Sequence, residues 1–227
     1  NPAPAAPYTG MLPGLIAGHY RRDEIMIDLI RLGSFAGARV ILDRAVGIDP
    51  AARLIHLQDR PPLRYDVASI DVGIGSGLPE VPGYAEHGVA AKPLGDYARR
   101  WEAFVALSLP APRVVIVGAG LGGVELALAS AHRLRAAGVT PAITLIERGP
   151  HALPHVGEAA RRSLLAELDR AGVLLLTAAE PAVIEDGAVV LQDGRRIGSD
   201  FTLSAAGSRP QGWLADTGLT LDDGFLR

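Results

Sequence analysis

Six consecutive residues near the middle of the chain, Gly118-Ala119-Gly120-Leu121-Gly122-Gly123, have the types and spacing needed to hold a phosphate group. An apolar run, residues 114–117, precedes them and a helical pattern, residues 124–129, follows, so they predict a strand-to-helix turn. In such a turn Gly118 permits a tight reversal, Gly120 lets a pyrophosphate approach the backbone, and Gly123 lets the helix pack closely on the strand. The free N–H groups of the helix N-terminus would then face the phosphates. The alternative is an α/β module without a nucleotide, in which the glycines serve packing only.

An acidic residue follows the next apolar strand pattern, where a dinucleotide-binding module needs a partner for ribose hydroxyls. Glu147 lies 29 positions after Gly118, compared with about 20 in the usual fingerprint, and a long intervening helix accounts for the excess. A carboxylate at this position repels a 2′-phosphate, which favours NADH over NADPH. Arg148 beside it carries the opposite charge, so NADPH remains the alternative cofactor.

The second half of the chain alternates strand and helix patterns. We expect strands at 113–117, 142–147 and 173–176, helices at 121–137 and 158–171, an antiparallel flap over 182–197 with a turn at Asp193-Gly194, and a closing strand at 200–205. This order predicts an α/β, Rossmann-like, three-layer fold with a mostly parallel sheet.

The first half is less regular. We expect an irregular proline-rich start over 1–13, one or two helices within 15–32, strands at 39–46, 53–57 and 65–72, a glycine- and proline-rich break at 73–83, and a helix at 94–107. A boundary near Leu109 then gives three parts. They are a partial FAD-binding domain at 1–109, an apparently complete NAD(P)-binding domain at 110–210, and the start of a return to the first domain at 211–227.

Composition excludes several classes of function. The net charge is −3, from 22 basic and 25 acidic residues without a basic stripe, so nucleic acid is not an expected partner. The absence of cysteine removes disulfides and thiolate chemistry. Glycines and Glu125 interrupt the most apolar run, so we expect no transmembrane segment, and no secretory signal is evident, which favours the cytoplasm. Pro154 separates His151 from His155, and we expect no metal site.

With these motifs identified, the chain resembles the pyridine nucleotide-disulfide oxidoreductase superfamily, near type II NADH dehydrogenases. Residues 118–125 resemble its NAD(P)H fingerprint, residues 147–154 the stretch after its second strand, and residues 65–76 and 204–210 its two crossovers between domains. Residues 8–14, 19–20, 69–73 and 92–94 resemble a dehydrogenase-like module found alone or fused to selenide, water dikinase.

The resemblance implies an FAD-dependent NAD(P)H oxidoreductase that passes hydride from NADH to flavin and on to a quinone or other small acceptor. It implies contacts with the dinucleotide from Gly118, Ala119, Gly120, Leu121, Gly122, Gly123, Glu125, Glu147, Arg148 and Gly207. No catalytic residue is assigned, because the cofactors themselves carry out hydride transfer.

The sequence also departs from the family pattern. The flavin pyrophosphate motif and the glycine-aspartate motif near the ribityl chain are both missing from residues 1–227. We therefore expect an internal segment of a longer parent that holds FAD, with the segment alone inactive. A regulatory or sensing module that binds NAD without turnover is the alternative. Apolar surface on residues 15–32 would favour self-association as a homodimer.

Overall fold

The computed structural model describes residues 1–78 and 80–227, which form two compact units. Unit 1 comprises Asn1–Tyr8, Met26–Gly75 and Arg209–Arg227, and unit 2 comprises Thr9–Ile25 and Ser76–Ser208. Pro79, inside the break expected at 73–83, lies outside the described residues. The units divide the chain differently from the boundary expected near Leu109, because two segments before it belong to unit 2. The assignment of segments to FAD or NAD(P) stays a prediction.

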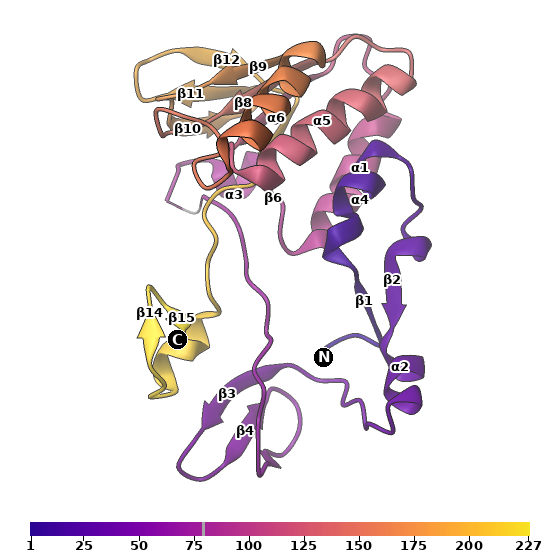
Figure 1. Ribbon diagram of the computed structural model, residues 1–227, viewed down its shortest axis with the longest axis vertical. Helices are drawn as coiled ribbons and strands as arrows, with labels where there is room; N and C mark the ends of the chain where they lie inside the picture. The colour runs from indigo at the N-terminus through magenta and orange to yellow at the C-terminus, as the bar shows by residue number, and fades with distance from the viewer. Residues whose placement is uncertain (79) are drawn as a thin grey trace. The chain divides into compact units, whose positions relative to one another are not determined.

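Unit 2 is built on a five-stranded parallel sheet (Figure 1). Its strands, in spatial order, are β6 (Gly88–Ala90), β13 (Phe201–Ser204), β7 (Arg113–Val117), β8 (Ala142–Ile146) and β9 (Val173–Leu176). Because all neighbouring pairs are parallel, their carboxyl ends lie along one edge of the sheet. The three strands expected at 113–117, 142–147 and 173–176 are confirmed, and so is the closing strand.

The central strand β7 buries both of its faces, which explains its uninterrupted apolar sequence. Val114 and Ile116 pack in the core beneath the helices, whereas Val115 and Val117 pack beneath the flap. The helical layer consists of α1 (Leu12–Ala17), α4 (Leu94–Ala106), α5 (Leu121–Ala136) and α6 (Glu158–Arg170). The flap is the antiparallel sheet of β10 (Pro181–Glu185), β11 (Ala188–Leu191) and β12 (Arg196–Gly198). The expected Rossmann-like three-layer α/β arrangement is therefore confirmed.

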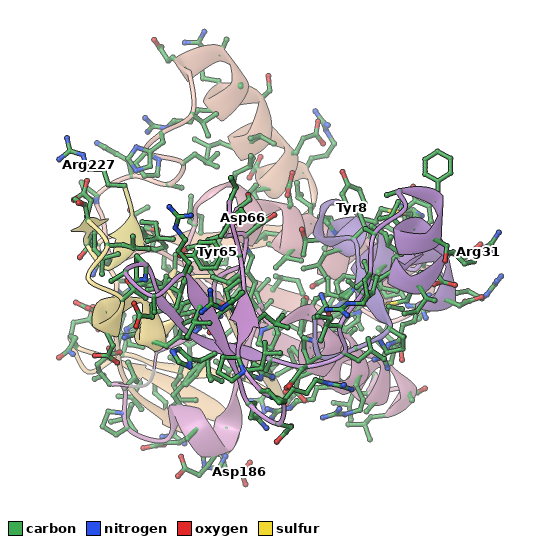
Figure 2. All side chains as sticks on the ribbon, turned by 90° about the horizontal axis from the view of Figure 1, so that it is seen from below. Tyr8, Arg31, Tyr65, Asp66, Asp186 and Arg227 are labelled. Carbon is green, nitrogen blue, oxygen red and sulfur yellow. The ribbon has the colours of Figure 1, made fainter. Side chains whose placement is uncertain are left out.

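Unit 1 consists of small antiparallel sheets and short helices. The elements are β1 (Ala5–Pro7) paired with β2 (Met26–Asp28), α2 (Leu29–Phe35), the sheet of β3 (Ala45–Asp49), β4 (Leu54–Leu57) and β5 (Leu63–Arg64), a 3-10 helix (Gly212–Asp216), and β14 (Leu221–Asp222) paired with β15 (Phe225–Leu226). Asp28 caps α2 by accepting hydrogen bonds from the N–H groups of Ile30 and Arg31, at 3.0 and 2.9 Å. The Arg31 side chain points away from the ribbon (Figure 2).

Several expectations for the first half were wrong. Two helices do overlap the range 15–32, α1 at its start and α2 at its end, but α1 stops before Gly18, whose φ is +82°, and strand β2 directly precedes α2. The start of the chain, expected to be irregular, supplies β1 as the partner of β2. The strand expected at 39–46 begins only at Ala45, and the one expected at 65–72 is absent. For β1 and β2, pairing between segments on either side of α1, and not local pattern, decides the structure.

Three short helical elements remain in the described chain. They are the 3-10 helices Thr9–Met11 and Asp23–Ile25 and the short α-helix α3 (Tyr84–His87). Within residues 1–78 and 80–227, no helix combines the length and the apolar character that a bilayer crossing needs.

Candidate functional site

The glycine-rich turn lies at the carboxyl edge of the parallel sheet, where the strand order changes direction. The chain proceeds from β7 outward to β8 and β9, and then returns to place β13 on the other side of β7. Such a switch point opens a crevice beyond the two diverging strands, and α/β proteins bind ligands there. Gly118 follows β7 directly and Ala206 follows β13, so both belong to this edge.

Two of the three signature glycines are required by the protein's own packing. Gly118 has a φ of +102°, and a Cβ there would lie 2.8 Å from the Cβ of Ala206. A Cβ on Gly123 would lie 1.8 Å from the carbonyl oxygen of Gly118, which no side chain can tolerate. The expected roles of these two glycines, the tight turn and the close helix–strand approach, agree with this geometry.

Gly120 is different, because nothing in the described chain requires it to be glycine. Its φ of −70° is accessible to any L-residue, and a Cβ there would meet no atom within 4 Å. A Cβ on Gly122 would likewise meet no atom within 4 Å. Gly120 is also the N-cap of α5 and provides no side-chain cap for the first N–H groups of that helix. The first N–H groups of α5 have no side-chain cap, and the space in front of them is open. This arrangement suits a phosphate group from outside the chain.

Glu147 lies directly beside this turn. One carboxylate oxygen, Oε2, accepts a hydrogen bond from the Ala119 N–H at 2.9 Å, and Oε1 accepts one from the Gly149 N–H at 2.8 Å. The side chain is partly buried, whereas Arg148 is exposed. These bonds hold the carboxylate at the mouth of the turn, where its remaining lone pairs can accept hydrogen bonds from hydroxyl groups.

Backbone hydrogen bonds hold the loop after Glu147 to the glycine-rich turn and to the segment after β9. The Leu153 N–H donates to the Ala119 carbonyl at 2.8 Å, and Leu153 itself is buried at 1% exposure with a φ of +56°. The Ala178 N–H donates to the Gly149 carbonyl at 2.8 Å. Sequence reasoning missed these supports, because backbone hydrogen bonds between loops leave no pattern of residue types.

The two connecting segments of unit 2 complete the edge. The Gly77 N–H donates to the Ala206 carbonyl at 3.2 Å, and a Cβ on Gly207 would lie 2.3 Å from the Gly77 carbonyl oxygen. Gly207 has a φ of +69°, so both conformation and packing call for glycine. Burial raises the pKa of the nearby Tyr84 hydroxyl, which keeps that group protonated and neutral at neutral pH. Gly77 and Ala206 thus lie beside the expected site residues, although the sequence did not indicate them. Only their contact in the folded chain brings them to this edge.

The remaining expected residues lie at the rim of the same turn. Leu121, at 49% exposure, and Glu125 are exposed on the first turns of α5, and Ala119 is buried beneath. Within residues 1–78 and 80–227, no cluster of three or more histidine, aspartate or glutamate side chains could hold a metal ion.

Comparison with known proteins agrees with this architecture. The family described as pyridine nucleotide-disulphide oxidoreductase matches residues 5–227. An NADH dehydrogenase-like protein of Mycobacterium tuberculosis is 29% identical over 184 residues, which cover 77% of this chain and 46% of the relative. The NADH dehydrogenase-like protein YutJ of Bacillus subtilis is 30% identical and covers 77% and 48%, respectively. The chain thus spans about half the length of these relatives.

Solved structures show the same fold at lower identity. The sulfide:quinone oxidoreductase of Aquifex aeolicus superposes with a TM-score of 0.80 at 20% identity, over 96% of this chain and 54% of that one. The NDH2 structure of Plasmodium falciparum in complex with NADH gives a TM-score of 0.79 at 15% identity, over 95% and 51%.

Proposed function

Because the chain belongs to the pyridine nucleotide-disulphide oxidoreductase family, we propose that its glycine-rich turn is the NAD(H) site of an FAD-dependent NAD(P)H oxidoreductase. NADH donates hydride, flavin receives it, and a quinone or another small molecule is the final acceptor. FAD and NAD(H) are the cofactors of this family, and they supply the redox chemistry. The residues of this chain bind and orient the dinucleotide.

One observation carries the proposal: Gly120 is a glycine that the chain itself does not need. Its backbone conformation is ordinary and the space at its Cβ position is open, in contrast to Gly118 and Gly123. Gly120 also lies after β7 at the point where the strand order changes direction, so its missing side chain leaves the α5 N-terminus open there to the negative charge of a pyrophosphate.

Each residue of the proposed site has a binding role. The backbone of residues 118–123 holds the pyrophosphate, and Glu147 accepts hydrogen bonds from ribose hydroxyls, which favours NADH. Arg148 lies at the adenosine side, while Glu125 and Gly207 border the path toward the nicotinamide.

Chemistry and relatives support the acceptor that we propose. Residues 1–227 contain no cysteine, so this part of the protein cannot relay electrons through a dithiol. Relatives include a demethylphylloquinone reductase of Synechocystis and a ferredoxin–NAD(+) reductase component of Paraburkholderia xenovorans. A quinone is the small acceptor we propose. Anaerobic bleaching of the flavin by NADH in the protein that carries this chain, followed by reoxidation with a soluble quinone, tests the sequence of transfers.

The dinucleotide site is tested by a matched pair of substitutions. Gly120→Val places a side chain in the path of the pyrophosphate without a clash inside the protein. Gly157→Val is the control, because Gly157 is also a helix N-cap with negative φ and open space at its Cβ position. We expect Gly120→Val to weaken NADH binding by about a hundredfold or more, since the phosphate contacts are lost, while Gly157→Val leaves it unchanged.

Calorimetric titration with NADH measures the affinity, and thermal unfolding shows that both variants remain folded. A folded Gly120→Val protein that binds NADH as tightly as the unaltered chain would remove residues 118–123 from the site. Equal losses in the two variants would point to a general effect of valine at a helix N-cap.

A further inference from the structure

A pocket separate from the dinucleotide site lies in unit 2, lined by residues of α1, α4 and α5 and of the loop that follows α1. It encloses 290 Å³, just below the range of about 300–1,000 Å³ typical of small-molecule sites. Its lining consists of Leu15 and Gly18 from α1 and its end, Tyr20, Arg21 and Arg22 from the following loop, Trp101, Glu102 and Val105 from α4, and Arg133 from α5. None of these residues belongs to the proposed dinucleotide site.

Arg133 is held against the backbone at the end of α1. A Cβ on Gly18 would lie 2.2 Å from Nη1 of Arg133, so the guanidinium occupies space that only glycine leaves free. The obvious structural task, capping the last carbonyls of α1, is already performed by other groups. Gly14 and Leu15 accept hydrogen bonds from the backbone N–H groups that follow the helix, at 2.8 and 3.0 Å.

The third carbonyl of this helix end is also satisfied. Ile16 accepts a hydrogen bond from Nε1 of Trp101 at 3.1 Å, which also fixes α1 against α4. Among the described residues, the Arg133 side chain donates no hydrogen bond and forms no ion pair within the protein. Its donors thus remain available to a group in the pocket.

The three arginines that line the pocket differ in whether an acidic side chain pairs with them. Arg21 forms ion pairs with both Asp23 and Glu24, at 2.9 and 3.8 Å. In the described part of the chain, Arg22 has no acidic partner, and neither does Arg133. Glu102 is the single carboxylate of the lining. Arg22 and Arg133 thus bring to the pocket two positive charges that no acid in the described chain pairs, which favours an anionic ligand.

The rest of the lining is apolar or aromatic and fixed in place. Leu15 and Trp101 are buried, with Trp101 at 2% exposure, and Val105 packs against the same core. Tyr20 remains 41% exposed at the opening, with its ring against Gly14. Walls provided by packed helices require little reordering when a ligand binds.

We propose that this pocket binds a small organic monocarboxylate, with Arg22 and Arg133 holding the carboxylate and the apolar wall holding the body of the ligand. Guanidinium groups pair with carboxylates through two parallel hydrogen bonds, which gives such a pocket specificity for that group. The proposal goes beyond the dinucleotide site and does not depend on it.

Cyclohexanecarboxylate is a suitable probe because it carries one negative charge on an apolar ring and does not absorb where tryptophan does. The chain has two tryptophans, so a Trp213→Phe background leaves Trp101 as the reporter of the pocket. In that background we expect saturable quenching or enhancement of fluorescence. The affinity should fall about tenfold or more in Arg22→Gln and in Arg133→Gln, because each loses a charged hydrogen-bonding group.

Two controls make the test specific. Arg162→Gln removes an exposed arginine on α6 that pairs with Glu158, and it should leave the affinity unchanged. Cyclohexanecarboxamide, the neutral counterpart of the probe, should bind at least about tenfold more weakly. Far-UV circular dichroism and the unfolding midpoint establish that each variant is folded, independently of NADH.

Absence of saturable binding would overturn the proposal. So would carboxylate binding that survives both arginine substitutions in folded protein, or equal affinity for the carboxylate and the carboxamide. Loss of NADH binding in Gly120→Val with carboxylate binding retained would separate the two sites.

Discussion

The two compact units differ sharply in how they bury apolar side chains. Among the described residues, the hydrophobic side chains of lowest exposure lie almost entirely in unit 2, and unit 1 contributes only Leu214 to that group. Unit 1 instead exposes large apolar side chains, including Phe35 and Val67 at 90% each and Leu32 at 51%. Unit 2 surrounds its sheet on both faces, whereas the small sheets of unit 1 have few residues to cover them.

Unit 2 is therefore stabilised by its own hydrophobic core, whereas the structure of unit 1 depends on few local contacts. Burial of apolar surface is the main favourable term in folding, so the free energy of unfolding should concentrate in unit 2. The candidate dinucleotide site and the proposed carboxylate pocket both lie in that unit. Rigid positioning of a binding site requires a packed scaffold beneath it.

The largest expected effect comes from removing apolar volume from each unit in turn. Ile116 has 0% exposure at the centre of β7, and Ile116→Ala should destabilise the protein by about 2–5 kcal/mol. Phe35→Ala removes a larger side chain from the surface of unit 1 and should change stability by no more than about 0.5 kcal/mol. Denaturant unfolding measures both. Similar losses from the two substitutions would break the contrast between the units.

A smaller effect is expected from the carboxylate beside the glycine-rich turn. Glu147→Ala should weaken NADH binding by about 1–2 kcal/mol and NADPH binding by less, because only NADH presents both ribose hydroxyls to a charged acceptor. Titration with each cofactor gives the two affinities, and Glu180→Ala, an exposed acid elsewhere in unit 2, is the control. If NADH and NADPH lose equal affinity, Glu147 does not select the cofactor.

The smallest effect concerns a pair that joins two strands of unit 2 near its surface. Arg113 donates to Asp200 through its backbone N–H at 2.8 Å and through Nε at 3.1 Å, and these hydrogen bonds lower the pKa of Asp200 below its usual 3.8. A lowered pKa means that the folded state prefers the ionised carboxylate. The contribution to stability is therefore present above the unfolded pKa and is lost as the pH falls through the folded value.

Arg113→Ala should return the pKa of Asp200 toward 3.8, as followed by NMR titration of its side-chain carboxyl carbon. Arg162→Ala provides the control, because that arginine pairs on α6 instead. A pKa that does not move in Arg113→Ala would show that solvent already screens the pair.

Local sequence was sufficient where each residue's role depends on near neighbours. Strand β7, the turn at 118–123 and helix α5 follow one another without a gap, and all were predicted within one residue. Their signals are an apolar strand, glycines at set spacing and a helical period, which are all properties of one short segment. Unit 1 was predicted less well: β1 pairs with β2, which lies beyond helix α1 in the sequence, and the weak apolar patterns did not identify that pair or the start of β3.

The sequence by itself thus determined the glycine-rich turn, the acidic residue after β8 and the class of fold. Only the tertiary structure decided that β13 returns beside β7, that Ala206 limits the space at Gly118, and that Gly120 alone of the three signature glycines remains open. It also decided that Arg22 and Arg133, 111 positions apart, line the same pocket. The physical reason is that such contacts depend on how helices and strands pack against each other, and residue types within one segment carry no record of that packing.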